Sequence, residues 1–138
     1  MNRLTLILFA FMWLFMNNPI RAQQIPTTII FNSIPGGPFP EISTTVYQTD
    51  NLTGVSVGSV TVELCTYTLG GQPPSSCFGS CSSILGNDGS ASCHLNLSIS
   101  PGEYTLFAIY DEGGGFIYQN SEVRQNVAGD FGGGISPI

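Results

Sequence analysis

Two hydrophobic patterns divide the chain. An apolar run over residues 4–16, interrupted only by Thr5, follows a single basic residue, Arg3, and leads into a short stretch that ends at Ala22. Beyond Ala22, short β-branched and aromatic stretches alternate with clusters of Gly, Pro, Asn and Asp, and no long stretch has the spacing of an amphipathic helix. The pattern therefore predicts an all-β protein that follows an apolar leader.

The leader has the features of a secretory signal peptide. Its apolar run is too short to cross a bilayer core of about 30 Å as a helix, and the flank Asn17-Asn18-Pro19 breaks a helix. We predict cleavage after Ala22; the alternative is an uncleaved N-terminal anchor, which no stop-transfer sequence supports. The mature chain, residues 23–138, is then expected to be secreted and extracellular, or periplasmic or on the cell surface in a bacterium, without a membrane span.

Alternation of apolar and polar residues predicts which strand faces are buried. Residues 23–138 have the length of one domain, and Val60, Val62 and Leu64 share one face of a strand. The stretch 104–110 is apolar on both sides, as expected for a central strand. The expected fold is a single antiparallel Greek-key β-sandwich of about seven strands. The predicted strands are 27–33, 42–49, 59–68, 90–98, 104–110, 116–119 and 122–127.

Residues 87–106 carry a recognisable combination of turns and strands. Asp88-Gly89 is a turn, an alternating strand follows, and Pro101-Gly102 with Tyr104 leads into the next strand. This combination resembles the Cna-B, prealbumin-like and carboxypeptidase-regulatory-like β-sandwiches. The resemblance implies an immunoglobulin-like fold and a binding or structural role. Many Cna-B domains are locked by a bond between Lys and Asn side chains, which this lysine-free chain cannot form.

Four cysteines in a secreted chain predict two disulfides, with three pairings open. Cys65 falls on the polar face of its predicted strand and Cys93 on the apolar face of another, so a direct bridge between them needs a bulge or an edge position. The local pairings of Cys65 with Cys77 and of Cys81 with Cys93 are favoured, although spacing does not settle the connectivity. The alternative is a zinc site that uses Cys77, Cys81, Cys93 and His94, which oxidising conditions disfavour.

A long predicted loop, residues 70–89, contains two of these cysteines. Its turn-forming composition gives no strand pattern, and the disulfides are expected to order it. Long pinned loops often carry binding sites, so this loop and the glycine-rich turn after residue 110 are the predicted contact surfaces for a protein or carbohydrate partner. The predicted partner contacts are Phe78, Asp111, Glu112 and Phe116.

One sequence pattern matches a hydrolase motif. Ser56 lies in a Gly-x-Ser-x-Gly stretch, and Asp88 and His94 follow in the order of an α/β-hydrolase triad. That motif requires a strand, a sharp turn and a helix over a parallel sheet, which this pattern does not predict. A small secreted serine hydrolase is therefore the alternative, and a non-catalytic protein without a cofactor is the leading interpretation.

A second alternative is calcium-dependent adhesion. Four acidic residues lie in or beside glycine-rich turns, where oxygen ligands from several loops can meet around Ca²⁺. The competing interpretation is that these acids only form turns, for which Asp is a common residue. The four residues are Asp88, Asp111, Glu112 and Asp130.

Two tripeptides, Asn51-Leu52-Thr53 and Asn96-Leu97-Ser98, match the N-glycosylation signal. Both asparagines are expected on the surface, so Asn51 and Asn96 are predicted acceptor sites if the source is eukaryotic.

The charge balance excludes some partners. Cleavage after Ala22 removes Arg3 and Arg21, which leaves Arg124 as the single Lys or Arg against nine acidic residues. Nucleic-acid backbones and anionic lipids are bound mainly by Lys and Arg, so neither is an expected partner. The leading hypothesis is a secreted, non-catalytic β-sandwich that acts as a binding or adhesive module.

Overall fold

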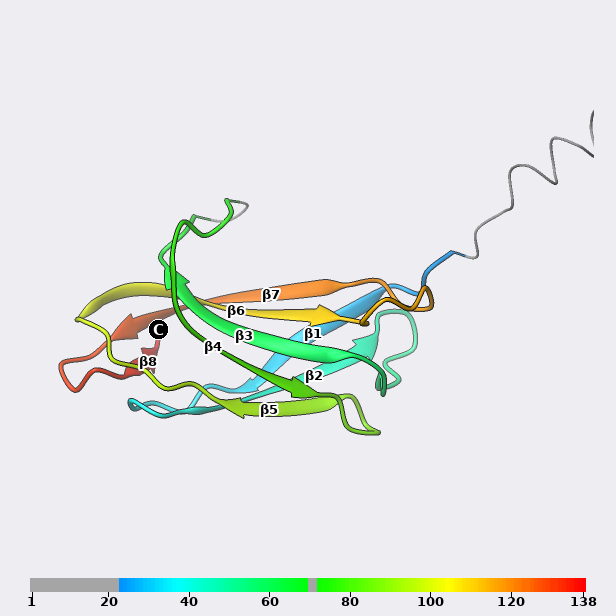
Figure 1. The fold of residues 1–138 in the computed structure, drawn as a ribbon, viewed down its shortest axis with the longest axis horizontal. Coiled ribbons are helices and arrows are strands. Elements are labelled where there is room, and N and C mark those ends of the chain that lie inside the picture. Colours follow the sequence, from blue (N-terminus) through cyan, green and yellow to red (C-terminus); the bar gives the residue numbers. More distant parts are fainter. Residues whose placement is uncertain (1–22, 70–71) are drawn as a thin grey trace, which may run out of the picture.

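A computed structural model describes residues 23–69 and 72–138, which form two β-sheets packed face to face (Figure 1). The predicted signal peptide, residues 1–22, lies outside the described residues. The described part has eight strands and no helix, and hence no helix that could cross a membrane. The strands are β1 (Thr27–Ser33), β2 (Glu41–Gln48), β3 (Ser59–Thr66), β4 (Cys77–Ile84), β5 (Ser90–His94), β6 (Gly102–Asp111), β7 (Ser121–Gly129) and β8 (Ile135–Pro137).

The two sheets are antiparallel and differ in size. One has the order β1-β2-β5 and the other the order β4-β3-β6-β7-β8. The chain crosses between the sheets after β2, β4 and β5, so that β2 pairs with β5 in one sheet while β3 pairs with β6 in the other. These crossings make the Greek-key connections predicted for the sandwich, and the all-β prediction is confirmed.

The core lies between the sheets, where the inward faces of the strands meet. Val60, Val62 and Leu64 of β3 are buried, as their alternation predicts, and they pack in one apolar cluster with Leu106 and Tyr110 of β6. Burying an aliphatic or aromatic side chain of this kind stabilises a fold by roughly 1.5–3 kcal/mol. A single core of this kind makes the two sheets one structural unit.

Both favoured disulfides are present. Cys65–Cys77 joins the neighbouring strands β3 and β4 within the larger sheet. Cys81–Cys93 joins β4 to β5, which are edge strands of opposite sheets. The described part of the chain has no free cysteine. One disulfide therefore reinforces a sheet, and the other ties the two sheets together.

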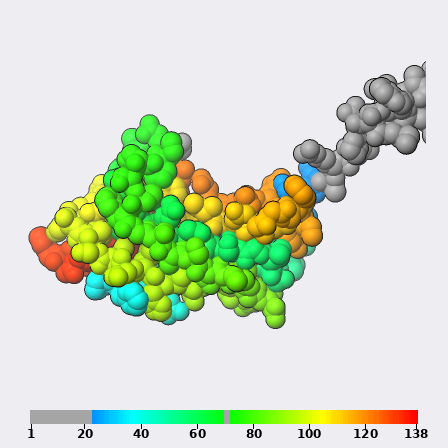
Figure 2. Space-filling model, in the orientation of Figure 1, coloured from blue at the N-terminus to red at the C-terminus, as the bar shows by residue number. Residues whose placement is uncertain are grey.

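Cys65 is fully buried, although its predicted face is the polar one. The chain after β3 folds over this outer face, where the Thr68 N–H donates to Thr105 Oγ1 at 3.1 Å. The backbone carbonyl of Gln72 accepts a hydrogen bond from Arg124 of β7 at 2.9 Å. Figure 2 shows the connection between β3 and β4 as a green projection from the body of the molecule. The outer face is thus covered locally, and the alternation of exposure fails there.

The structure differs most from the prediction in three parts of the chain. The centre of the predicted loop 70–89 forms β4, whose Ser- and Gly-rich sequence has low strand propensity but pairs with β3 along its length. The predicted strand 116–119 makes only one bridge, between Tyr118 and Ile25. The short strand β8, which ends in Pro137, was not predicted; proline is tolerated there because β8 lies at a sheet edge.

The Asp88-Gly89 turn of the family resemblance has the expected positive φ, whereas Gly102 has a φ of 156° and begins β6, so Pro101-Gly102 does not have the geometry of a type II turn. Gly89 has a φ of 82°, and the Asp88 carboxylate accepts hydrogen bonds from the N–H and hydroxyl of Ser90. The Tyr104 hydroxyl donates to the Ser100 carbonyl at 2.7 Å, which is the tyrosine corner known from immunoglobulin-like sandwiches. These contacts fix the crossing from β5 to β6, while membership of a Cna-B-like family stays a prediction.

The two disulfides form a matched pair for a stability test, because both have a sequence separation of 12. Loop-closure entropy alone predicts an equal loss of about 3 kcal/mol in the free energy of unfolding when either is removed. We expect the double variant Cys81→Ala/Cys93→Ala to lose more than Cys65→Ala/Cys77→Ala, because it also releases β5 from β4. Urea unfolding measures both losses. Equal losses would show that the link between the sheets adds nothing beyond loop closure.

Candidate functional site

The antiparallel strands place the connecting loops at two ends of the sandwich (Figure 1). We call the end where the described chain begins the entry end, and the opposite end, which carries the β7–β8 turn, the far end. The entry end consists of residues 23–26 and the loops 49–58, 85–89 and 112–120. The far end consists of the loops 34–40, 95–101 and 130–134, with residues 67–69 and 72–76.

The structure does not bring the hydrolase residues together. Ser56 lies in the loop between β2 and β3 at the entry end, whereas His94 ends β5 toward the far end. Asp88 is at the entry end, but its carboxylate is hydrogen-bonded to Ser90. Ser56, Asp88 and His94 therefore do not form a hydrogen-bonded triad.

His94 has an acidic neighbour that its sequence context does not reveal. Its Nε2 lies 3.8 Å from a carboxylate oxygen of Glu41, its pairing partner across β2 and β5, and its ring stacks on Phe39. Both side chains of the pair are largely exposed, so a contact of this kind adds little to stability. Only the register of β2 against β5 could have identified Glu41 as the neighbour.

The four acids considered for calcium do not converge. Asp130 is at the far end, where its carboxylate accepts hydrogen bonds from the N–H groups of Gly132 and Gly134. Asp88 and Asp111 are at the entry end, and each likewise caps a turn in its own loop. These three acids therefore act as turn formers, and the four-residue calcium site is not assembled.

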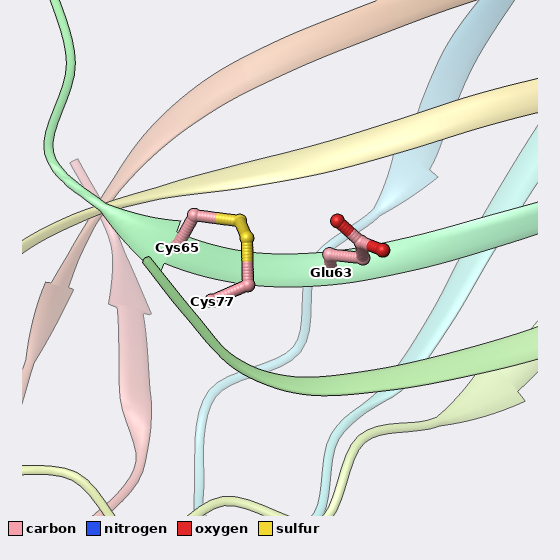
Figure 3. Close-up of side chains that lie close together, drawn as sticks. All are labelled: Glu63, Cys65 and Cys77. Atoms are coloured by element: carbon pink, nitrogen blue, oxygen red, sulfur yellow. A yellow bond between two sulfur atoms is a disulfide. The ribbon is translucent and has the colours of Figure 1, made fainter. Parts of the chain in front are cut away.

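One cluster in the described part of the chain has metal-ligating side chains close together, and Figure 3 shows it on the outer face of the larger sheet. The ligand atoms of Glu63, Cys65 and Cys77 lie within 4.8 Å of one another. The two sulfur atoms are bonded to each other, so they offer no thiolate to a metal ion. Cys81 and Cys93, the other thiol ligands of the zinc alternative, are consumed in the same way.

Three of the four predicted partner contacts meet at the entry end. Asp111, Glu112 and Phe116 line a hollow of about 460 Å³ beside the β6–β7 loop, together with residues such as Gln24 and Tyr118. A volume of this order lies in the range of small-ligand pockets. The fourth, Phe78, is elsewhere: its ring packs edge-on against Tyr104 toward the far end. The predicted contacts from one loop therefore line one hollow, and the contact from the cysteine-rich segment does not join them.

Residues at the start of the described chain hold the hollow in shape. The Ile25 N–H donates to the Ile117 carbonyl at 2.7 Å, and the Gln119 N–H donates to the Ile25 carbonyl at 2.9 Å. The Thr49 N–H donates to the Pro26 carbonyl at 3.0 Å, which ties the β2–β3 loop to the same segment. Residues 25 and 26 thus connect two loops that are far apart in sequence.

Glu112 organises the β6–β7 loop from within. Its side chain is only 7% exposed, and its Oε2 accepts a hydrogen bond from the Tyr118 N–H. Its own N–H donates to Asn120 Oδ1 at 3.2 Å. A Cβ at position 115 would overlap Glu112 Oε1, so a glycine fits there. The loop therefore closes around a carboxylate, an arrangement that could not be predicted from the run of glycines.

Tyr110 lies in β6 just before this loop, close enough to its acidic residues to interact with them electrostatically. The Tyr110 hydroxyl is buried and donates to the Val57 carbonyl at 2.8 Å. Burial is the main cause that raises the pKa of Tyr110 to about 12, and its electrostatic interactions with Glu112, Tyr118 and Asp111 act in the same direction. Asp111 and Glu112 therefore place negative charge close to this end of β6.

The loops of the entry end carry several exposed apolar side chains. Phe116 is 79% exposed, and Ile117 and Val57 are also exposed. Leu52 is 73% exposed and has a φ of 60°, which is an uncommon conformation for a bulky residue. Sequence reasoning missed Leu52, whose only signal is the adjacent Asn51, an exposed turn residue that caps the Thr53 N–H. A strained and exposed leucine is typical of a contact residue.

The remaining predicted surface residues are away from the hollow. Asn96, the second predicted glycosylation site, is exposed in the connection after β5. Arg124, the single Lys or Arg among the described residues, lies on the outer face of the larger sheet, pairs with Glu122 at 3.2 Å and covers the ring of Phe107 at 4.7 Å. The hollow therefore has no Lys or Arg from the described chain.

Comparison of the chain with protein-family models and with curated proteins gives no match.

The raised pKa of Tyr110 predicts a loss of stability in base. Below pH 10 this tyrosine is protonated in both states, so it adds no pH dependence. Between pH 10.0 and about 12 the unfolded chain releases the proton while the folded protein retains it, so the free energy of unfolding falls as the pH rises. Urea unfolding over this range measures the slope. The variant Tyr110→Phe is expected to lose part of that slope, and an unchanged slope would contradict the assignment.

Proposed function

We propose that this protein is a secreted, non-catalytic binding module that contacts a protein partner through the entry end of its sandwich. The observation that carries the proposal is the set of exposed apolar residues in the loops of the entry end, above all the strained Leu52 and the exposed Phe116, at the same end as the acidic hollow. Exposed apolar and aromatic side chains that gather on one part of a surface are characteristic of protein-binding sites.

The rest of the fold suits a scaffold for such loops. The strands that precede and follow the β6–β7 loop, β6 and β7, pair over their full length. The connection from β5 to β6 is fixed by Tyr104, and the sheets are joined by Cys81–Cys93. Loops held by a rigid sandwich are a common way to present a binding surface. The disulfides suit an oxidising, extracellular environment, in agreement with the predicted signal peptide.

A protein partner accounts for this surface better than a carbohydrate. Sugar rings stack on flat, accessible aromatic faces, whereas the exposed residues here include two aliphatic side chains, Leu52 and Ile117, beside one ring, Phe116. We assign the contact to a partner at the surface of the cells that secrete the protein.

Substitutions at the two ends of the sandwich test this proposal. The protein is purified from the medium, where its intact mass should be that of residues 23–138 with both disulfides formed. We expect Leu52→Asn and Phe116→Ser each to weaken binding to the secreting cells by about tenfold or more, as for central contact residues. Asparagine is chosen at position 52 because it tolerates the positive φ of that residue. Labelled protein in a cell-binding titration measures the affinity.

The matched control is Phe131→Ser at the far end, since Phe131 is 98% exposed and is thus at least as accessible as Leu52 and Phe116. It should bind like the unaltered protein, and the melting temperature should be unchanged in all three variants. Loss of binding only in Phe131→Ser would place the contact at the far end. Equal binding by all variants would overturn the proposal.

A further inference from the structure

We propose that the hollow at the entry end binds a primary ammonium group, the head of a lysine side chain on the partner. This inference rests on the proposed function, since it names the anchor by which the partner is held. It follows from the charge of the hollow, from the number of free carboxylate oxygens and from the aromatic residues beside them.

The hollow contains a buried carboxylate without a cation. Glu112 is 7% exposed and lines the hollow, and none of the described residues forms an ion pair with it. Arg124 is engaged with Glu122 and Phe107 on the outer face of the larger sheet. Glu112 therefore retains only limited contact with water, and a positive charge beside a carboxylate in such a position stabilises it. A cation from outside the described chain would supply that charge.

Each carboxylate presents one oxygen without a protein hydrogen bond. Glu112 Oε2 accepts from the Tyr118 N–H and Asp111 Oδ1 accepts from the Gly113 N–H, while the second oxygen of each accepts no hydrogen bond from the described residues. An ammonium group is a compact charge with separate donors, so it can bond to single oxygens of different carboxylates. A guanidinium group bonds best to both oxygens of one carboxylate, and in each of these residues one oxygen already accepts a backbone N–H. The hollow therefore favours lysine over arginine.

The other lining residues favour an organic cation over a metal ion. Phe116 and Tyr118 line the hollow, where a ring face can attract a positive charge and the rings can pack against the apolar stem of a lysine. Calcium takes roughly six to eight oxygen ligands, and the rings supply none. Asn120, which also lines the hollow, has its Oδ1 occupied by the Glu112 N–H. An alkylammonium ion thus matches more of the lining than Ca²⁺ does.

The sequence requires that such a lysine come from elsewhere. The chain has no lysine, so no side chain of the protein can fill the hollow with an ammonium group. The α-amino group is the alternative occupant from the same chain, because Gln24 lines the hollow and cleavage after Ala22 would place the new terminus next to it. The experiment must therefore separate an external ammonium group from the protein's own terminus.

The test uses n-butylammonium as the probe and the secreted protein as it is purified. Titration is followed by the backbone amide NMR signals of residues 111–120 and 24. We expect saturable shifts with a Kd of about 1 mM or tighter, the order expected of a fragment of a larger ligand. The neutral analogue n-butanol should give no saturable shift, and n-butylguanidinium should bind at least about threefold more weakly.

Two variants and a matched control locate the interaction. Glu112→Gln keeps an oxygen for the Tyr118 N–H, and Asp111→Asn keeps one for the Gly113 N–H, so both should fold while binding the probe at least about tenfold more weakly. The control is Glu63→Gln, which removes a partly buried carboxylate from the outer face of the larger sheet. It should bind n-butylammonium like the unaltered protein.

Four results would overturn the inference. These are equal shifts with n-butanol, tighter binding of n-butylguanidinium, displacement of the probe by Ca²⁺ at similar concentration, and binding that appears only after acetylation of the α-amino group. The last result would show that the protein's own terminus occupies the hollow. If the probe fails but Leu52→Asn still weakens cell binding, only this inference falls, because the contact surface would remain.

Discussion

The disulfide between Cys81 and Cys93 is the constraint on which the arrangement of the two sheets depends. The smaller sheet has three strands, and its edge strand β5 is only five residues long. A domain of this size buries a modest core, so it gains much from a covalent link. Because the link joins edge strands of opposite sheets, it closes one open side of the sandwich and fixes how the sheets face each other. The loops at both ends are therefore attached to sheets whose relative position is fixed.

The distribution of charge then separates a structural face from a functional one. The single arginine of the described residues covers Phe107 and holds the connection after β3 in place, so it is used for packing. The acids of most turns are hydrogen-bonded to backbone N–H groups of their own loops, which explains their presence without a ligand. Glu112 differs because it is buried and still has an oxygen that no described residue occupies. A cation on an external partner can therefore stabilise Glu112 more than it can stabilise the acids that form turns.

Alternation in the sequence predicted the parts of the fold that have one wet face. The inward positions Val60, Val62 and Leu64 and the bounds of β1 are as predicted. Strand β4 could not be predicted because its Ser and Gly residues favour turns, and its pairing with β3 comes from tertiary context. The buried position of Cys65 was likewise hidden, since it depends on chain that folds back over the outer face.

The candidate site was predicted in part. Asp111, Glu112 and Phe116 were expected as contacts because of their glycine-rich turn, and they line one hollow. The burial of Glu112 depends on its bond to Tyr118, and the position of Tyr118 depends on a bridge to Ile25, more than ninety residues earlier in the chain. Local sequence contains no signal of such a contact. The same holds for the positive φ of Leu52, which no glycine marks.

The central claim is that a rigid sandwich presents its entry end to a partner. Hydrogen exchange of the protein, free and bound to the surface of the cells that secrete it, tests this claim most directly. Slow exchange is expected in β3 and β6 in both states, with added protection on binding within loops 49–58 and 112–120. Added protection confined to loops 34–40, 95–101 and 130–134 would contradict it.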